Sequence, residues 1–172
     1  MKKISIILVG VIISTSSVIA QGTLAKGEKQ LNAGLGISTF GVPVYLGADF
    51  GISENITIGP RISYRKYTEK YFGNKYSQSL SVISFNGNYH FNQLLKLPDA
   101  WNVYAGVTLG YYIWSDVKWN TGSTTGFGGE GSGLGLDAQV GARYFFNENF
   151  GINLELGGGT GSGGIIGITY KL

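Results

Sequence analysis

Hydrophobic residues alternate with small or polar residues along most of the chain after residue 29. In the clearest stretch every second residue from Val103 to Ile113 is apolar, whereas Gly106 and Thr108 belong to the opposite face. A period of two is the pattern of a β-strand with one face in an apolar environment. Such stretches occur at residues 31–38, 44–52, 56–65, 83–91, 102–113, 134–144, 150–157 and 166–172. The pattern therefore predicts an all-β domain of eight antiparallel strands.

The segments between these strands predict how the strands are connected. Short polar turns lie at residues 53–55 and 147–149, with a longer link at 92–100, and the other strand ends meet at 39–43, 68–78, 115–132 and 158–163. Short turns on one rim and longer loops on the other are typical of outer-membrane barrels, whose short turns face the periplasm. We therefore expect residues 68–78 and 115–132 to form the main extracellular loops.

Aromatic residues gather at both ends of the predicted strands. Near the short turns are Phe50, Tyr89, Phe91, Trp101, Tyr144, Phe145, Phe146, Phe150 and Tyr170, and near the loops are Tyr64, Tyr67, Tyr111, Tyr112 and Trp114. Two such bands are expected where aromatic rings sit at the two membrane–water interfaces. Since lipid offers no hydrogen bonds to a sheet edge, the sheet has to close. The prediction is an eight-stranded antiparallel up-and-down transmembrane β-barrel.

The N-terminus has the layout of a secretory signal. Lys2 and Lys3 precede an apolar run at residues 4–13, and Val18 and Ala20 occupy the positions that a signal peptidase reads. The run is diluted by serine and threonine and is shorter than the roughly 20 apolar residues of a spanning helix. We expect residues 1–20 to be a cleaved signal peptide and residues 21–172 to be a single barrel domain in the outer membrane of a Gram-negative bacterium.

Composition narrows the classes of function. The chain has 29 glycines among 172 residues and 13% charged residues, which is atypical of a soluble domain. Lys2 and Lys3 leave with the signal, so 11 of the 13 basic residues remain and nearly balance the 10 acidic ones. Nucleic-acid binding needs a concentrated basic face, so we expect no nucleic-acid partner.

Charged residues recur on the face predicted to point inward. An eight-stranded barrel has an interior just wide enough for side chains, and buried charges are tolerated when they are paired. We therefore expect a lumen filled by a network of ion pairs, with an open pore as the alternative. The predicted network consists of Asp49, Arg61, Arg65, Asp137, Arg143, Glu155 and Lys171.

Three strand segments carry a family resemblance. They are Tyr89–Phe91, Trp101–Gly106 and Gly141–Phe146. Together with the signal, they resemble the outer-membrane β-barrel domain family, the small barrels similar to the OmpA membrane domain and OmpX. The resemblance implies an integral outer-membrane protein with a role in envelope integrity, adhesion or small-solute passage. It also implies contact with outer-membrane lipids, lipopolysaccharide and, during biogenesis, the barrel-assembly machinery.

Catalytic and metal chemistry have little support in the sequence. His90 is the single histidine, and it is predicted to face inward near the periplasmic rim without a serine or carboxylate partner. With one histidine and no cysteine, a transition-metal site is not expected. We therefore expect neither enzymatic activity nor a cofactor, and keep a membrane-embedded lipid-modifying enzyme as a minor alternative.

The predicted loops carry aromatic and cationic residues, which are common binding anchors. These candidate contacts are Tyr71, Phe72, Lys75, Tyr76, Trp119 and Phe127. They could bind an extracellular ligand or pack over the barrel mouth. The leading hypothesis is a structural or adhesive barrel, with a small porin as the alternative. A soluble barrel of lipocalin type would need its apolar faces inside.

Overall fold

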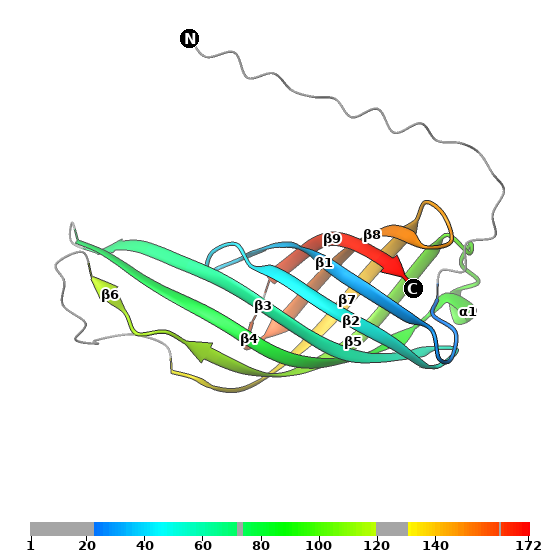
Figure 1. Ribbon diagram of the computed structural model, residues 1–172, viewed down its shortest axis with the longest axis horizontal. Coiled ribbons are helices and arrows are strands. Elements are labelled where there is room, and N and C mark those ends of the chain that lie inside the picture. Colours follow the sequence, from blue (N-terminus) through cyan, green and yellow to red (C-terminus); the bar gives the residue numbers. More distant parts are fainter. Residues whose placement is uncertain (1–22, 72–73, 120–130, 162) are drawn as a thin grey trace, which may run out of the picture.

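The computed structural model describes residues 23–71, 74–119, 131–161 and 163–172. Its strands are β1 Lys29–Ser38, β2 Val44–Ser53, β3 Ile56–Tyr71, β4 Asn74–His90, β5 Trp101–Trp114, β6 Lys118–Trp119, β7 Gly133–Phe145, β8 Phe150–Gly159 and β9 Gly163–Lys171. Neighbouring strands pair antiparallel, and β1 also pairs with β9, which closes the sheet. The two-residue β6 pairs with the outer part of β4. The remaining eight strands form the barrel in Figure 1, which confirms the predicted fold class.

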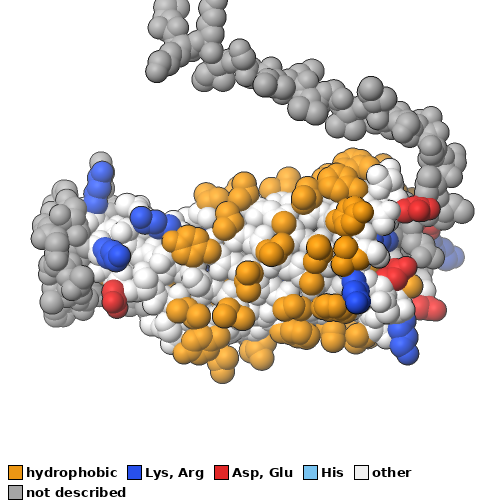
Figure 2. Space-filling view, in the orientation of Figure 1, with side chains coloured by type: hydrophobic (Ala, Val, Ile, Leu, Met, Phe, Trp, Pro, Cys, Tyr) orange, Lys and Arg blue, Asp and Glu red, His pale blue; other side chains and the backbone are white. Residues whose placement is uncertain are grey.

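The barrel carries its apolar side chains outside. Leu31 is 44% exposed, whereas its neighbour Asn32 is 3% exposed, and the same alternation continues around the sheet. On the face of the barrel shown in Figure 2, the outward apolar residues form a broad band, and the charged residues are concentrated towards the two ends. An apolar exterior around a polar interior is the arrangement of a transmembrane barrel. It excludes the soluble alternative with an apolar interior.

The two ends of the barrel differ. The end with the β2–β3 and β7–β8 turns is called the turn end here, and the end with the β3–β4 hairpin is called the hairpin end. At the turn end, α1 (Asn92–Leu95) lies within the β4–β5 link, for which the sequence predicts no helix but only a longer connection at residues 92–100. Within the described ranges, no helix is long and apolar enough to cross a membrane.

The prediction of a loop at residues 68–78 was wrong. β3 runs to Tyr71 and β4 begins at Asn74, with register pairs as far as Tyr71 and Asn74. The predicted loop is therefore a paired hairpin that projects beyond the apolar band (Figure 1). Alternation weakens in this segment because neither face of a projecting hairpin meets lipid, so the sequence lacked the period-two signal. The 158–163 loop is also shorter than expected, because β8 extends to Gly159 and β9 starts at Gly163.

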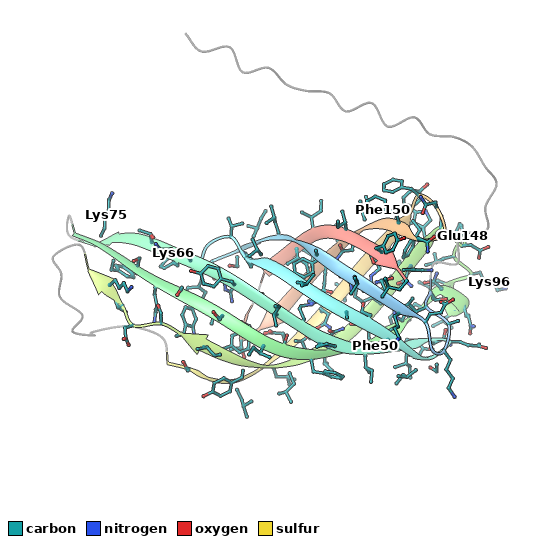
Figure 3. The ribbon with its side chains drawn as sticks, in the orientation of Figure 1. Phe50, Lys66, Lys75, Lys96, Glu148 and Phe150 are labelled. Atoms are coloured by element: carbon teal, nitrogen blue, oxygen red, sulfur yellow. The ribbon has the colours of Figure 1, made fainter. Side chains whose placement is uncertain are left out.

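Most of the predicted aromatic bands lie on the outer surface. At the turn end, Trp101 and Tyr144 have ring centroids 5.0 Å apart, and Tyr144 and Phe146 are 5.4 Å apart. Figure 3 places Phe50 and Phe150 near the same end. The assignment was wrong for Phe145 and Tyr112, which are buried in the lumen, and for Trp114, which packs against the buried residues beside Tyr112. Each of the three belongs to the inward-facing set of its strand.

The polar lumen as candidate functional site

Three layers of side chains occupy the barrel interior. The layer near the turn end contains Asp49 and Arg143, the middle layer contains Arg61 and Glu155, and the layer near the hairpin end contains Arg65 and Asp137. Since the sheet alternates, each of these residues points inward from a strand whose next residue faces outward. The first two layers form a packed assembly, and the third borders a cavity.

Asp49 is the centre of the first layer. Its carboxylate accepts a charged hydrogen bond of 2.6 Å from Arg143 Nη2, and amide hydrogen bonds of 2.9 Å from Asn32 and 3.1 Å from Asn86. The side chains of Asp49 and Arg143 are 2% and 1% exposed. A buried carboxylate is tolerated when a cation and hydrogen-bond donors surround it, and Asp49 meets this condition.

Arg61 and Glu155 form the second layer through a two-pronged contact. Arg61 Nη1 and Nη2 donate to the two Glu155 oxygens at 2.6 Å and 3.1 Å. Tyr104 donates its hydroxyl to Glu155 at 2.8 Å, and its ring lies 4.5 Å from the Arg143 guanidinium. The two ion pairs are therefore linked by one tyrosine, which brings together four of the seven charges that were predicted to interact.

The other three predicted charges lie apart from this group. Asp137 accepts hydrogen bonds from the Tyr112 hydroxyl and, at 2.7 Å, from the Gly161 amide. Lys171 reaches the Thr23 carbonyl at 3.3 Å, and its ammonium lies 4.4 Å from the centre of the Phe145 ring. Arg65 is also buried. The seven charges thus do not form a single connected network.

Sequence reasoning overlooked the side-chain amides of the lumen. Gln139 donates to Asn88 at 2.9 Å and accepts from Thr108 at 3.1 Å, and Asn153 donates to Tyr45 at 2.7 Å. Amides can bridge groups of either sign because each carries both donors and an acceptor. The sequence pattern could have revealed these amides, because they occupy the inward-facing positions of β1, β4, β5, β7 and β8. The buried amides are Gln30, Asn32, Gln78, Asn86, Asn88, Asn102, Gln139 and Asn153.

His90 has partners that the sequence did not reveal. Its Nδ1 lies 2.8 Å from Asn102 Oδ1, and its Nε2 lies 2.9 Å from Thr57 Oγ1. An amide oxygen accepts hydrogen bonds, so Nδ1 carries the proton and Nε2 accepts from the Thr57 hydroxyl. A hydroxyl, an imidazole and an amide in this order resemble a hydrolase relay. However, Thr57 has no exposed surface and His90 is 1% exposed, so a lipid ester cannot reach the hydroxyl.

Glycine makes room for the rings inside the narrow barrel. A Cβ at Gly141 would lie 2.3 Å from the Tyr104 ring. A Cβ at Gly167 would lie 2.5 Å from the Tyr45 hydroxyl. The Tyr104 ring therefore lies over a glycine of the neighbouring strand β7, and the Tyr45 ring reaches across β1 to a glycine of β9. These contacts explain part of the glycine excess on the inner face.

A cavity of about 100 Å³ lies in the hairpin half of the lumen. Its walls include Arg61 and Glu155 towards the middle of the barrel, and Arg65, Tyr112 and Asp137 towards the hairpin end. Small residues of the β8–β9 hairpin, including Gly161, also line it. Next to it, Leu80, Val82 and Tyr112 form a small apolar cluster inside the barrel.

The predicted loop contacts are only partly described. Tyr71 lies at the end of β3 and Trp119 in β6, whereas Phe72 and Phe127 lie outside the described residues. Tyr76 is half-buried, and its ring centroid is 6.1 Å from that of Tyr67. Tyr67 in turn contacts Phe40, which contacts Trp114 at 5.4 Å. Lys75 is exposed (Figure 3).

The ends of the barrel carry different charge. At the hairpin end the exposed lysines are Lys66, Lys75 and Lys118, and Asp116 is exposed among the acidic side chains described there. At the turn end the exposed charged residues are Lys26, Glu28, Lys29, Glu54, Lys96, Asp99 and Glu148. Among the exposed side chains that the structure describes, cations therefore outnumber acidic residues at the hairpin end, whereas acidic residues slightly exceed basic ones at the turn end.

Comparison with known proteins identifies the fold. No family model matches the sequence, and no curated protein is similar to it. Solved structures with the same fold include the N-terminal β-barrel domain of Pseudomonas aeruginosa OprF, at 14% identity and TM-score 0.55, covering 87% of this chain and 100% of that one. Neisserial surface protein A is 15% identical with a TM-score of 0.58, covering 84% and 95%.

A third similar structure was solved with a ligand. Ail, the attachment invasion locus protein of Yersinia pestis, is 12% identical with a TM-score of 0.57, covering 86% of this chain and 99% of Ail, in complex with the heparin analogue sucrose octasulfate. The fold is thus that of the small eight-stranded outer-membrane barrels, as the sequence resemblance implied.

Proposed function

We propose that this protein is an integral outer-membrane barrel that does not conduct and that binds sulfated glycans through its hairpin end. The observation that carries the proposal is the contrast along the barrel axis. The lumen is packed near the turn end, whereas the β3–β4 hairpin projects past the apolar band with exposed lysines (Figures 1 and 2). A barrel of this form offers a surface for binding rather than a path for solutes.

The membrane location is supported by the outer surface. A continuous apolar band with aromatic residues at the turn end matches a barrel spanning a bilayer. The outer-membrane location follows from this surface together with the N-terminal signal expected at residues 1–20. Lipopolysaccharide and other outer-membrane lipids would then surround the band, after insertion by the barrel-assembly machinery.

The binding role is supported by charge and by ring placement. Lys66, Lys75 and Lys118 are exposed at the hairpin end, where the rings of Tyr67 and Tyr76 also contact each other. Cations attract sulfate esters, and aromatic faces pack against sugar rings in many binding sites. The sulfated ligand seen with Ail is of the same chemical class. Catalysis is not part of the proposal, because the hydroxyl beside His90 is fully buried.

Surface binding is tested with sucrose octasulfate as the probe. The mature protein in detergent micelles is titrated with this compound and compared with the triple variant Lys66→Glu, Lys75→Glu, Lys118→Glu. We expect the variant to bind at least tenfold more weakly. The matched control reverses three exposed lysines at the other end, Lys26→Glu, Lys29→Glu and Lys96→Glu, and should bind as the parent does. Equal losses in both variants, or no binding by the parent, would contradict the proposal.

A further inference from the structure

The cavity in the hairpin half contains two opposite charges, neither of which has a direct ion-pair partner among the described residues. Arg65 is 6% exposed, yet within the described part of the chain no hydrogen bond or ion pair holds its guanidinium. On the same cavity, Asp137 is held by two neutral donors, the Tyr112 hydroxyl and the Gly161 amide. Arg65 and Asp137 face one space without forming an ion pair. This differs from the other lumen carboxylates, Asp49 and Glu155, which each contact an arginine.

The net charge of the cavity wall indicates what kind of molecule would fit. Arg61 and Glu155 neutralise each other through their two-pronged contact, which leaves one positive group, Arg65, and one negative group, Asp137. A simple anion would add one net negative charge to this neutral wall, and a simple cation would add one net positive charge. Uncompensated buried charge is costly. A molecule that carries both charges satisfies both groups at once.

The free hydrogen-bonding capacity agrees with this conclusion. A guanidinium has five N–H donors, and a carboxylate has about four acceptor sites, of which Asp137 uses two. Arg65 can therefore hold a carboxylate, and Asp137 can accept two further hydrogen bonds from an ammonium group. The Tyr112 hydroxyl donates to Asp137 and keeps its own acceptor capacity beside the same site.

The size of the cavity limits the ligand to a few heavy atoms. Its volume is about 100 Å³, and one water molecule needs roughly 10–15 Å³ of such space. The cavity therefore holds several waters or one small organic molecule. Two glycines that line it, Gly161 and Gly163, belong to the tip of the β8–β9 hairpin, which places the cavity at the mouth of the barrel.

We propose that the hairpin half of the lumen is a binding site for a small amino-carboxylate zwitterion, whose carboxylate pairs with Arg65 and whose ammonium pairs with Asp137. The site is independent of glycan binding, because it lies inside the barrel and uses none of the exposed lysines. It is also a closed-ended site, since the ion pairs of Arg61 and Arg143 fill the lumen beneath it.

Calorimetric titration of the full mature barrel in detergent micelles tests the proposal. The probes are glycine, β-alanine and γ-aminobutyrate, which space the two charges progressively further apart. Acetate, phosphate and methylammonium serve as singly functional comparisons. We expect at least one amino acid to bind tenfold or more tightly than any of these three. Binding of acetate or phosphate as tight as that of the best amino acid would overturn the proposal, as would the absence of amino-acid binding.

Variants connect the binding to the two charges. Arg65→Met and Asp137→Asn should each weaken the best amino acid at least tenfold. Lys96→Met, which removes an exposed cation at the turn end, should leave the affinity unchanged. A shift in gel mobility on heating verifies that each variant is a folded barrel. If the folded Arg65→Met and Asp137→Asn variants bind as the parent does, the ligand sits elsewhere and the proposal is wrong.

Discussion

The two halves of the lumen both contain buried arginine and aspartate side chains, but these side chains make different contacts in each half. Near the turn end, Arg143 is buried against Asp49 at 2.6 Å and under the Tyr104 ring. Near the hairpin end, Arg65 is buried beside a cavity and has no such contact among the described residues. An arginine that supports a packed layer is a structural residue. An arginine with unused donors beside a cavity has capacity left for a ligand.

The largest expected loss of stability comes from substituting Arg143, the arginine of the packed layer near the turn end. Arg143→Met leaves Asp49 as a buried charge without its cation, which costs about 3–5 kcal/mol of unfolding free energy. Urea titration of the barrel refolded into lipid vesicles measures this loss. Adding Asp49→Asn to the same protein should recover a large part of it. A loss below about 1 kcal/mol for Arg143→Met would show that the ion pair does not hold this layer together.

Overfilling the packed half gives the next largest effect. Gly141→Val places side-chain atoms where the Tyr104 ring lies and disturbs its bond to Glu155. We expect a loss of about 2–3 kcal/mol, typical of an overpacked interior. Gly158→Val is the matched control, because a Cβ there meets nothing within 4 Å. Equal stability of the two variants in urea would show that Tyr104 is free to move.

The hydrogen bonds of His90 give a smaller effect in the same half. Thr57→Val keeps the shape of the side chain but removes the hydroxyl beside His90 Nε2. A buried acceptor left without a donor costs about 1–2 kcal/mol. Thr68→Val, at an exposed position of β3, should change the unfolding free energy very little. If both threonine variants retain the parent's stability, the His90 contacts contribute nothing measurable.

The smallest effect is expected in the hairpin half. Arg65→Met removes a buried charge that has no direct partner, so its stability should stay within about 0.5 kcal/mol of the parent or rise. The measurement is the same urea titration as for Arg143→Met, which makes the two values directly comparable. A loss similar to that of Arg143→Met would remove the distinction between the two halves.

The sequence predicted the barrel better than it predicted the contacts inside. Membrane burial imposes period two on every spanning strand, so the faces of Asn32, Thr108 and Glu155 could be assigned without a structure. The projecting hairpin lacks that constraint, which is why the sequence pattern predicts a loop at residues 68–78 instead of paired strands. Pairing inside the lumen depends on which strands face each other across the barrel, and Arg61 and Glu155 are far apart in sequence.

Ion conductance tests the central claim, that the turn half closes the lumen, most directly. The parent protein is inserted into a planar lipid bilayer, and current is recorded under an applied voltage in potassium chloride. The two ion pairs and the amides around Asp49 should leave no continuous water path, so the current should stay at the level of the lipid. Stable conductance steps from the parent protein would contradict the account and favour the small porin.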